Sequence, residues 1–368
     1  MKKLSVVEAV AFLVGTQIGA GVLGLPHALK NLGFLGILLI AFVGFMTMIT
    51  AIVVLNFSER IDKSLSGITG DCLGKVGKMV MFLSISILIY GAMIAYISSS
   101  GELLNGLVKI NKSLASYIFW ILFSAIVFFG LKFSGKTEVL LNIILIFAIM
   151  TGIVMVFPQW KVQNLSNFQL DKVIPAIGVI AFAFVSHMLV PEILRGVGDK
   201  KKAFWSVIWG FLIPMFFYSL FVIAFIGSLG KNTPEIATIV LKEKGNFGKI
   251  IGIILPLSAI ATSYIGVSFA QMRNIEDFFK TNKMMAWLFT IFPPLVIYQM
   301  GLKSFVKALW MGGTFGGILY AGILPVIMYF KCEKNKKPLF SFLVLGAGIL
   351  FSLVFFSSIK EILTEFIK

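Results

Sequence analysis

The chain has 368 residues, of which 58% are hydrophobic and only 13% charged, and its mean hydropathy is +0.98. A soluble fold of this size needs about a quarter of its residues charged, so the composition excludes a soluble domain. The net charge of +16 does not indicate nucleic-acid binding, because Lys and Arg stand in short gaps between long apolar runs. These runs do not alternate as barrel strands do. The sequence therefore predicts an all-α integral membrane protein.

Eleven apolar runs are long enough to cross a bilayer as helices. They cover about residues 5–28, 33–57, 79–108, 114–133, 137–157, 172–195, 203–229, 248–271, 284–300, 306–330 and 339–362. If the N-terminus is cytoplasmic, the inner loops hold more than half of the 32 Lys and Arg residues, so we expect this orientation, with the C-terminus outside. Cys72 and Cys332 then fall in cytoplasmic loops, where reduced thiols are expected.

Two gaps look more structured than simple turns. Residues 64–78 follow the second span and are amphipathic, and residues 233–244 follow the seventh, with Thr233 as a predicted helix cap before Pro234. Their equivalent places indicate two repeats of five spans, at 1–158 and 159–331, with an added C-terminal helix in 332–368. Because five is odd, the second repeat is inverted. Such repeats are typical of secondary transporters, in which the first helix of each repeat is broken near the midplane.

The first span contains the run GTQIGAGVLGLP at residues 15–26. Four glycines and a proline disfavour a continuous helix. An unwound stretch within the bilayer is tolerated where protein or a water-lined cavity receives the freed backbone groups. Amides near Gly19 and Gly21 can then hold a carboxylate, and freed carbonyls can hold a cation. The alternative is close helix packing through small residues.

The sixth span carries the corresponding feature. Pro175 and Pro191 bracket the run FAFVSH, which ends at His187. A histidine at mid-span is costly to bury and marks a functional interior, although a neutral imidazole satisfied by a neighbouring carbonyl is the alternative. Phe184 is expected to pack, and Glu192 to pair with Arg195 or with a lysine of the next loop.

Polar side chains also occur in the third and eighth spans. The third offers Tyr90 and Tyr96, and a tyrosine hydroxyl that faces the first break would be a second donor to a carboxylate. It also contains the run AYISSSG at 95–101. The eighth carries Ser258, Ala259, Thr262 and Ser263. Their oxygens suit a hard cation such as sodium, and the alternative is bonding back to the preceding helical turn.

Enzyme chemistry has no support in the sequence. With His27 and His187 as the only histidines, a multi-histidine metal site is excluded, and no Walker A motif is present. We therefore expect no enzyme activity and no cofactor, and transport driven by ion gradients.

The motifs together resemble the hydroxy and aromatic amino acid permeases, in the amino acid/auxin permease group of the APC superfamily, which has the leucine-transporter fold. The resemblance rests on residues 15–21 with Leu25 and Pro26, on Tyr90 and AYISSSG, on the sixth span, and on ATSYIGV at 261–267. It implies an amino acid symporter of aromatic or small neutral substrates, coupled to Na⁺ or H⁺. Some proton-driven relatives have a lysine in span five at the ion site. This chain has no lysine between Glu138 and Pro158, which argues against a lysine-based proton mechanism. His187, which can titrate near neutral pH, keeps proton coupling open.

The resemblance and the local chemistry together predict the site. Expected substrate contacts are Thr16, Gln17, Gly19, Ala20, Gly21, Tyr90, Phe184, Ser186 and His187. Expected ion ligands are the carbonyls of Gly15 and Ile18, with Ala259, Thr262 and Ser263. Small residues at Gly24 or Ser186 would leave room for an aromatic substrate.

We expect alternating access, in which spans one, two, six and seven rock against three, four, eight and nine. The expected partners are an amino acid and the lipid bilayer of the cell membrane, with no nucleic acid and no obligate protein partner. The alternative is a non-transporting amino acid sensor of the germinant-receptor type, which has the same fold.

Overall fold

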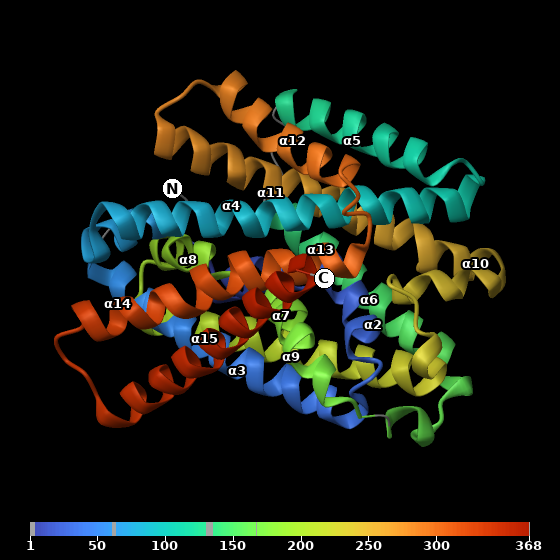
Figure 1. Cartoon of the computed structure of the whole chain (residues 1–368), viewed down its shortest axis with the longest axis horizontal. Helices are drawn as coiled ribbons and strands as arrows, with labels where there is room; N and C mark the ends of the chain where they lie inside the picture. The colour runs from blue at the N-terminus through green and yellow to red at the C-terminus, as the bar shows by residue number, and fades with distance from the viewer. Residues whose placement is uncertain (1–3, 61–63, 130–134, 167, 368) are drawn as a thin grey trace.

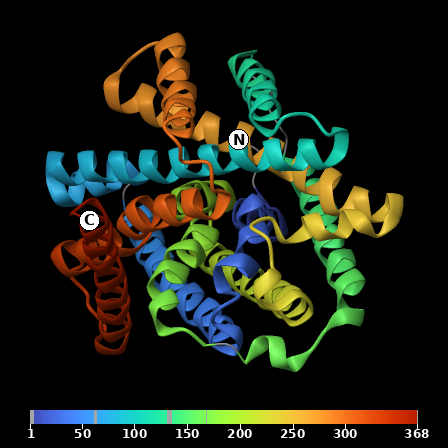
Figure 2. The same ribbon diagram turned by 45° about the vertical axis from the view of Figure 1, so that its right-hand side comes forward.

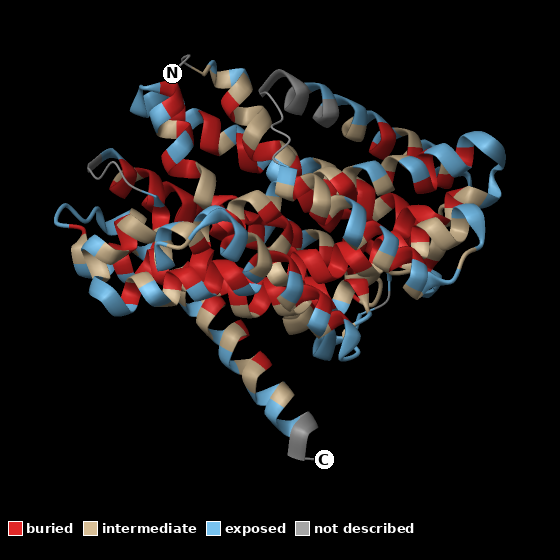
Figure 3. Cartoon of the chain, turned by 90° about the horizontal axis from the view of Figure 1, so that it is seen from above, coloured by how far each residue is buried: buried red, intermediate tan, exposed pale blue. Residues whose placement is uncertain are grey.

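The computed structural model describes residues 4–60, 64–129, 135–166 and 168–367, and these residues form helices and connecting turns without a strand. α4 crosses the width of the molecule, with α5, α11 and α12 on one side and α3, α7 and α9 on the other (Figure 1). The same two groups remain separate when the molecule is turned (Figure 2). α15 projects away from the body, and much of its surface is exposed (Figure 3). The molecule therefore has two helical layers that meet along α4 and η9.

The long helices follow the predicted spans. They are α3 (Gly33–Arg60), α4 (Leu65–Val108), α5 (Lys112–Phe129), α6 (Gly135–Val156), α9 (Lys200–Leu229), α11 (Leu255–Phe279), α12 (Lys283–Gln299) and α15 (Pro338–Ile367). The tenth span is divided into α13 (Phe305–Met311), the π-helix η9 (Gly312–Ile323) and α14 (Leu324–Cys332). Short helices occupy the connections: η2 (Phe157–Gln159), η3 (Val162–Leu165), η4 (Leu170–Lys172), η6 (Gly230–Asn232) and η7 (Ala237–Glu243). α10 (Gly245–Lys249) and the π-helix η8 (Ile250–Ile254) run into α11 and form the first part of the eighth span.

The first span is broken. α1 (Val6–Gln17) ends before Gly19, which has extended backbone angles (φ −105°, ψ −151°), and η1 (Ala20–Gly24) and α2 (Leu25–Leu29) continue after a bend of 42°. Ser5 and Glu8 form a capping box that fixes the start of α1. The break lies within the glycine-rich run, where helix propensity is lowest.

The sixth span is broken as well. α7 (Val173–Phe184) ends at Val185, which is extended, and η5 (His187–Leu189) and α8 (Val190–Val197) follow. Pro191 lies in the first turn of α8. Amides in the first turn make no hydrogen bond within the helix, so the amide hydrogen that proline lacks costs α8 nothing. Both predicted discontinuities are therefore present.

Within the described residues, eight helical segments are long and apolar enough to cross a membrane, and the bent first span makes a ninth. The two other predicted spans coincide with α6, which is apolar over Ile143–Gln159, and with α12, which has 17 residues. The protein is thus a multi-pass membrane protein. The count of eleven spans and the two repeat boundaries stay predictions.

One expectation about the connections is confirmed and another was wrong. The gap at 64–78 is more structured than a turn, because a short helix begins at Leu65 and the non-helical Gly74 (φ 78°) separates it from the long apolar part of α4. Cys72 and Cys332 are not reduced loop thiols, because they form a disulfide between α4 and α14, with Cα atoms 6.0 Å apart. The two helices pack side by side, which brings the cysteines within the distance that a disulfide spans.

Candidate functional site

The two helix breaks meet at the side chain of Tyr218 on α9. Its hydroxyl lies 2.5 Å from the carbonyl oxygen of Gln17 and 3.0 Å from that of Ala183. Gln17 is the last residue of α1, and Ala183 belongs to the last turn of α7, so both carbonyls have lost a helical partner. Tyr218 is fully buried. One hydroxyl thus serves the freed backbone of both broken spans.

The side chain of Gln17 joins the same three helices. Its Nε2 donates to Ser186 Oγ and to the carbonyl oxygen of Gly210, each at 3.0 Å. The Gly210 carbonyl lacks its own helical donor because Pro214, four residues later in α9, has no amide hydrogen. Gln17 Oε1 is buried and has no hydrogen-bond partner among the described residues. The structure therefore brings Gln17 and Ser186 together as a polar centre between the breaks.

The glycines of the first break lie close to α7 and α11. A Cβ atom added at Gly19 would lie 3.1 Å from Ser263 Oγ, and one added at Gly21 would lie 3.3 Å from the ring of Phe182. Ser263 also lies beside the hydroxyl of Tyr96 on α4. Gly19 and Ala20 are fully enclosed with Gly21 in the core. Ser263, and with it Tyr96, therefore faces the first break.

Tyr218 was missed as a site residue. Tyr96 was noted beside Tyr90 in the third span, but only Tyr90 was included in the predicted site. Tyr218 lies in an apolar span with no break, and the signal near it was Pro214 at the middle of that span.

His187 faces α3, α9 and η9 rather than the first span. Its Nε2 lies 2.9 Å from Thr50 Oγ1, and its ring meets Phe211 and Tyr320 edge-on. Nδ1 has no hydrogen-bond partner among the residues that the structure describes. The imidazole thus has a hydroxyl partner in Thr50 and also interacts with the backbone of Thr47, which agrees with the carbonyl alternative.

Two other predicted residues have different surroundings from those expected, and Phe184 packs as expected. The Tyr90 hydroxyl donates to the Phe289 carbonyl on α12 at 2.5 Å, so the predicted direction toward the first break was wrong. Thr16 is exposed and bonds back to Phe12. Phe184 is fully buried and packs on Tyr218, with ring centres 5.1 Å apart.

The predicted ion ligands are partly assembled. Thr262 Oγ1 donates to the carbonyls of Ser258 and Ala259, which is the backbone-bonding alternative. A hydroxyl that donates its hydrogen in this way keeps its lone pairs for a cation, so this set still fits a hard cation. Of the predicted ion ligands, Ser263 lies next to the first break, beside Gly19. The carbonyls of Gly15 and Ile18 stay predicted ligands.

The far end of the first span is tied to residues 233–235. His27 Nδ1 and Lys30 Nζ lie 2.8 and 3.2 Å from the Thr233 carbonyl oxygen. Glu235 accepts hydrogen bonds from Ser304 Oγ and the Val306 amide at the start of α13. The Thr233 hydroxyl donates backward to the Gly230 carbonyl, and Thr233 ends η6 instead of starting a helix at Pro234, so the predicted N-cap was wrong. This segment therefore bridges the end of α2 to the start of α13.

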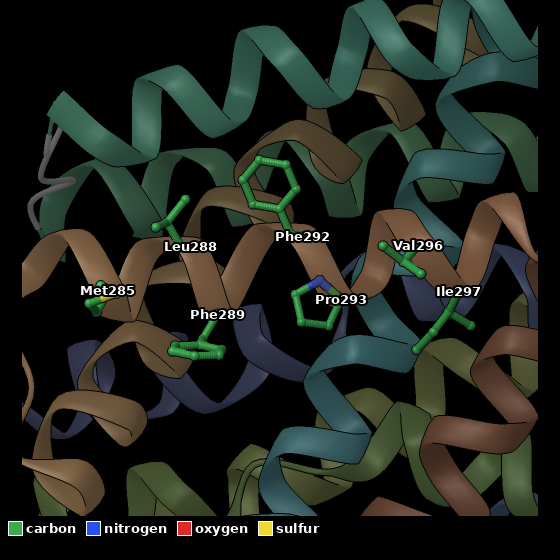
Figure 4. Close-up of a pocket in the computed structure, with 7 residues that line it drawn as sticks. All are labelled: Met285, Leu288, Phe289, Phe292, Pro293, Val296 and Ile297. Atoms are coloured by element: carbon green, nitrogen blue, oxygen red, sulfur yellow. The ribbon is translucent and has the colours of Figure 1, made fainter.

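Two candidate locations for a substrate are disfavoured by their surroundings. A cavity of about 520 Å³ lies along α12 and is lined by apolar side chains from Met285 to Ile297 (Figure 4). It offers no partner for a charged ligand. Gly24 leaves no space for an aromatic substrate either. A Cβ atom added at Gly24 would lie 3.0 Å from the Leu309 side chain and 3.1 Å from the Phe305 ring. The polar centre between the breaks is the better candidate.

Comparison with known proteins identifies the family. The model of the tryptophan/tyrosine permease family matches residues 2–365. The chain is 26% identical to tyrosine-specific transport system 1 of Haemophilus influenzae, over 90% of both chains. It is 24% identical to the tryptophan-specific transport protein of the same organism, over 99% of this chain and 96% of that one. Glutamine transporter 2 of Aliivibrio fischeri is 23% identical over 88% of both chains.

The fold has a solved counterpart. The crystal structure of MhsT in complex with L-phenylalanine superimposes with a TM-score of 0.72, covering 97% of this chain and 99% of that one, at 13% sequence identity. This likeness confirms the fold expected from the broken first and sixth spans. The match of the family model over nearly the whole chain confirms the resemblance seen in the motifs: the protein belongs to the tryptophan/tyrosine permease family.

Proposed function

We propose that the protein carries an aromatic amino acid, tyrosine or tryptophan, by alternating access, with the substrate held between the two helix breaks. As a member of a permease family it is an amino acid transporter and not an enzyme. The choice of an aromatic substrate rests on the family and on the relatives named for tyrosine and tryptophan. The observation that carries the proposal is the convergence of both breaks on Tyr218.

The two charges of the substrate have matching partners at this centre. Amides at the start of η1, around Gly21, suit its carboxylate, because the first amides of a helix lack partners within it. The Gly19 amide donates to the Gln17 carbonyl at 2.8 Å and would have to exchange that bond for one to the substrate. Gln17 Oε1, which has no partner among the described residues, suits its ammonium group. Small residues at the break leave the backbone within reach, since no side chain shields it.

Ion-coupled symport is part of the proposal. The hydroxyls of Thr262 and Ser263 suit Na⁺, and coupling to H⁺ is the alternative. Uptake into proteoliposomes with sodium and pH gradients imposed independently separates the two ions. No stimulation by a sodium gradient or by a pH gradient, each imposed alone, would refute coupling.

The proposed orientation places the N-terminus in the cytoplasm and the C-terminus outside, on the strength of the loop charges. Protease access to a tag at each end, in right-side-out membrane vesicles, tests it. Digestion of the N-terminal tag in intact vesicles would reverse the assignment.

Substitution of Gly21 tests the substrate site. A leucine side chain there begins 3.3 Å from the Phe182 ring and projects into the break, so uptake of labelled tyrosine and tryptophan should be abolished. Gly346→Leu is the matched control, because no atom lies within 4 Å of its added Cβ. Full uptake by the folded Gly21→Leu variant would refute the site. Failure of the wild-type protein to accumulate either amino acid against a gradient would refute transport of aromatic substrates.

A further inference from the structure

The helix α9 touches the first break twice, and both contacts depend on special residues of α9. The Tyr218 hydroxyl binds the Gln17 carbonyl, and the Gly210 carbonyl accepts the Gln17 side-chain amide. Gly210, Pro214 and Tyr218 are spaced by four residues, so they lie along one face of α9 over two turns. Gln17 is thus held by α9 at both its backbone and its side chain.

The same face also reaches the second break. The Tyr218 hydroxyl lies 3.0 Å from the Ala183 carbonyl, and its ring packs against Phe184. Two carbonyl oxygens that approach one point repel each other unless a positive group lies between them. Either a cation or a hydrogen-bond donor can serve as this positive group. Here the Tyr218 hydroxyl lies between the Gln17 and Ala183 carbonyl oxygens.

We propose that Tyr218, supported by Pro214, is a positioning residue that sets substrate affinity by holding the two helix breaks together. This inference rests on the proposed function. Tyr218 supplies the donor that the freed carbonyls share. Pro214 leaves the Gly210 carbonyl without a helical donor, so that this carbonyl orients the side chain of Gln17. The binding groups of both breaks are then arranged before substrate arrives, which reduces the ordering cost of binding.

The test compares two tyrosine variants. Tyr218→Phe removes the shared hydroxyl, while Tyr264→Phe removes an equally buried hydroxyl whose partner is Ser124, at 2.8 Å. Labelled L-tyrosine and L-tryptophan uptake into proteoliposomes gives KM and the maximal rate for each. We expect Tyr218→Phe to raise KM by about tenfold or more, as for a lost buried hydrogen bond, and Tyr264→Phe to change it by less than about twofold.

A second variant separates positioning from folding. Pro214→Ala restores an amide that can bond to the Gly210 carbonyl, so it competes with Gln17 while adding a hydrogen bond to α9. We expect a raised KM without a lower thermal midpoint. This variant decides the question if Tyr218→Phe does not fold.

The outcomes are distinct. Wild-type uptake with an unchanged KM in Tyr218→Phe, or equal changes in both tyrosine variants, would overturn the positioning role and leave the proposed function standing. If Tyr218→Phe is not folded, an unchanged KM in Pro214→Ala would overturn it. Absence of uptake by the wild-type protein would overturn the proposed function, and this inference with it.

Discussion

Replacement of Gly313 by alanine should both destabilise the protein and disturb the second helix break. Gly313 lies in η9, where it packs directly on the backbone of α7. An added Cβ atom would lie 2.0 Å from the Gly178 carbonyl oxygen and 2.8 Å from Phe182 Cβ. Ordinary contact begins at 3.4 Å, so α7 and η9 would have to separate by about 1.4 Å.

The magnitude follows from the close packing of these helices. Neither contacting atom is the end of a flexible side chain, so the strain falls on the backbone. Overpacking of this kind costs about 1–3 kcal/mol. The shift also displaces Phe182 and its neighbour Ala183, whose carbonyl meets Tyr218, so we expect a higher KM for uptake as well.

Gly346→Ala is the control. No atom lies within 4 Å of its added Cβ, and alanine in a helix is favoured over glycine by about 0.5–1 kcal/mol. The two substitutions should therefore change stability in opposite directions when unfolding is followed in detergent micelles. A Gly313→Ala variant as stable as the wild-type protein would refute the close approach of α7 and η9.

Three further predictions concern single contacts. Gln17→Met removes the donor to Ser186 and Gly210 and should raise the KM of uptake by about fivefold or more. The control is Gln271→Met, which removes a similar amide–hydroxyl hydrogen bond and should leave KM nearly unchanged. Similar KM values in the two variants would contradict this prediction. Tyr90→Phe should lower thermal stability by about 1 kcal/mol without altering KM, and a raised KM would restore the substrate role first inferred from sequence. Finally, neither cysteine should react with a maleimide under denaturing conditions until a reductant is added, and labelling without reductant would show that the disulfide is absent.

The sequence predicted the broken spans because their cause is local. The glycines before Pro26 weaken the first helix, and the apolar runs define where helices cross the bilayer. The same reasoning located Gln17 and Ser186 within the breaks. It also paired Glu192 with Arg195, and the structure confirms this ion pair.

The sequence did not predict contacts between distant segments. Tyr218 and Gln17 are 201 positions apart, and Cys72 and Cys332 are 260 positions apart. A tyrosine in an apolar span has no local feature that reveals its partner. Tyr90 was chosen over Tyr96 because spacing along one helix does not show which face meets the first break.

The chemistry of the polar centre bears on which substrates it accepts. The groups that meet there are amides, hydroxyls and main-chain carbonyls from Gln17, Ser186, Tyr218 and Ser263, and none of these side chains carries a formal charge. Such dipoles can satisfy the opposite charges of a zwitterion, because the whole molecule is neutral and its desolvation is compensated locally. A substrate with a charged side chain would bring one more charge without a counter-charge among these groups, and an unpaired buried charge is costly. Selection of a neutral amino acid thus follows from the use of backbone and hydroxyl groups, and discrimination among neutral side chains depends on the apolar walls around them.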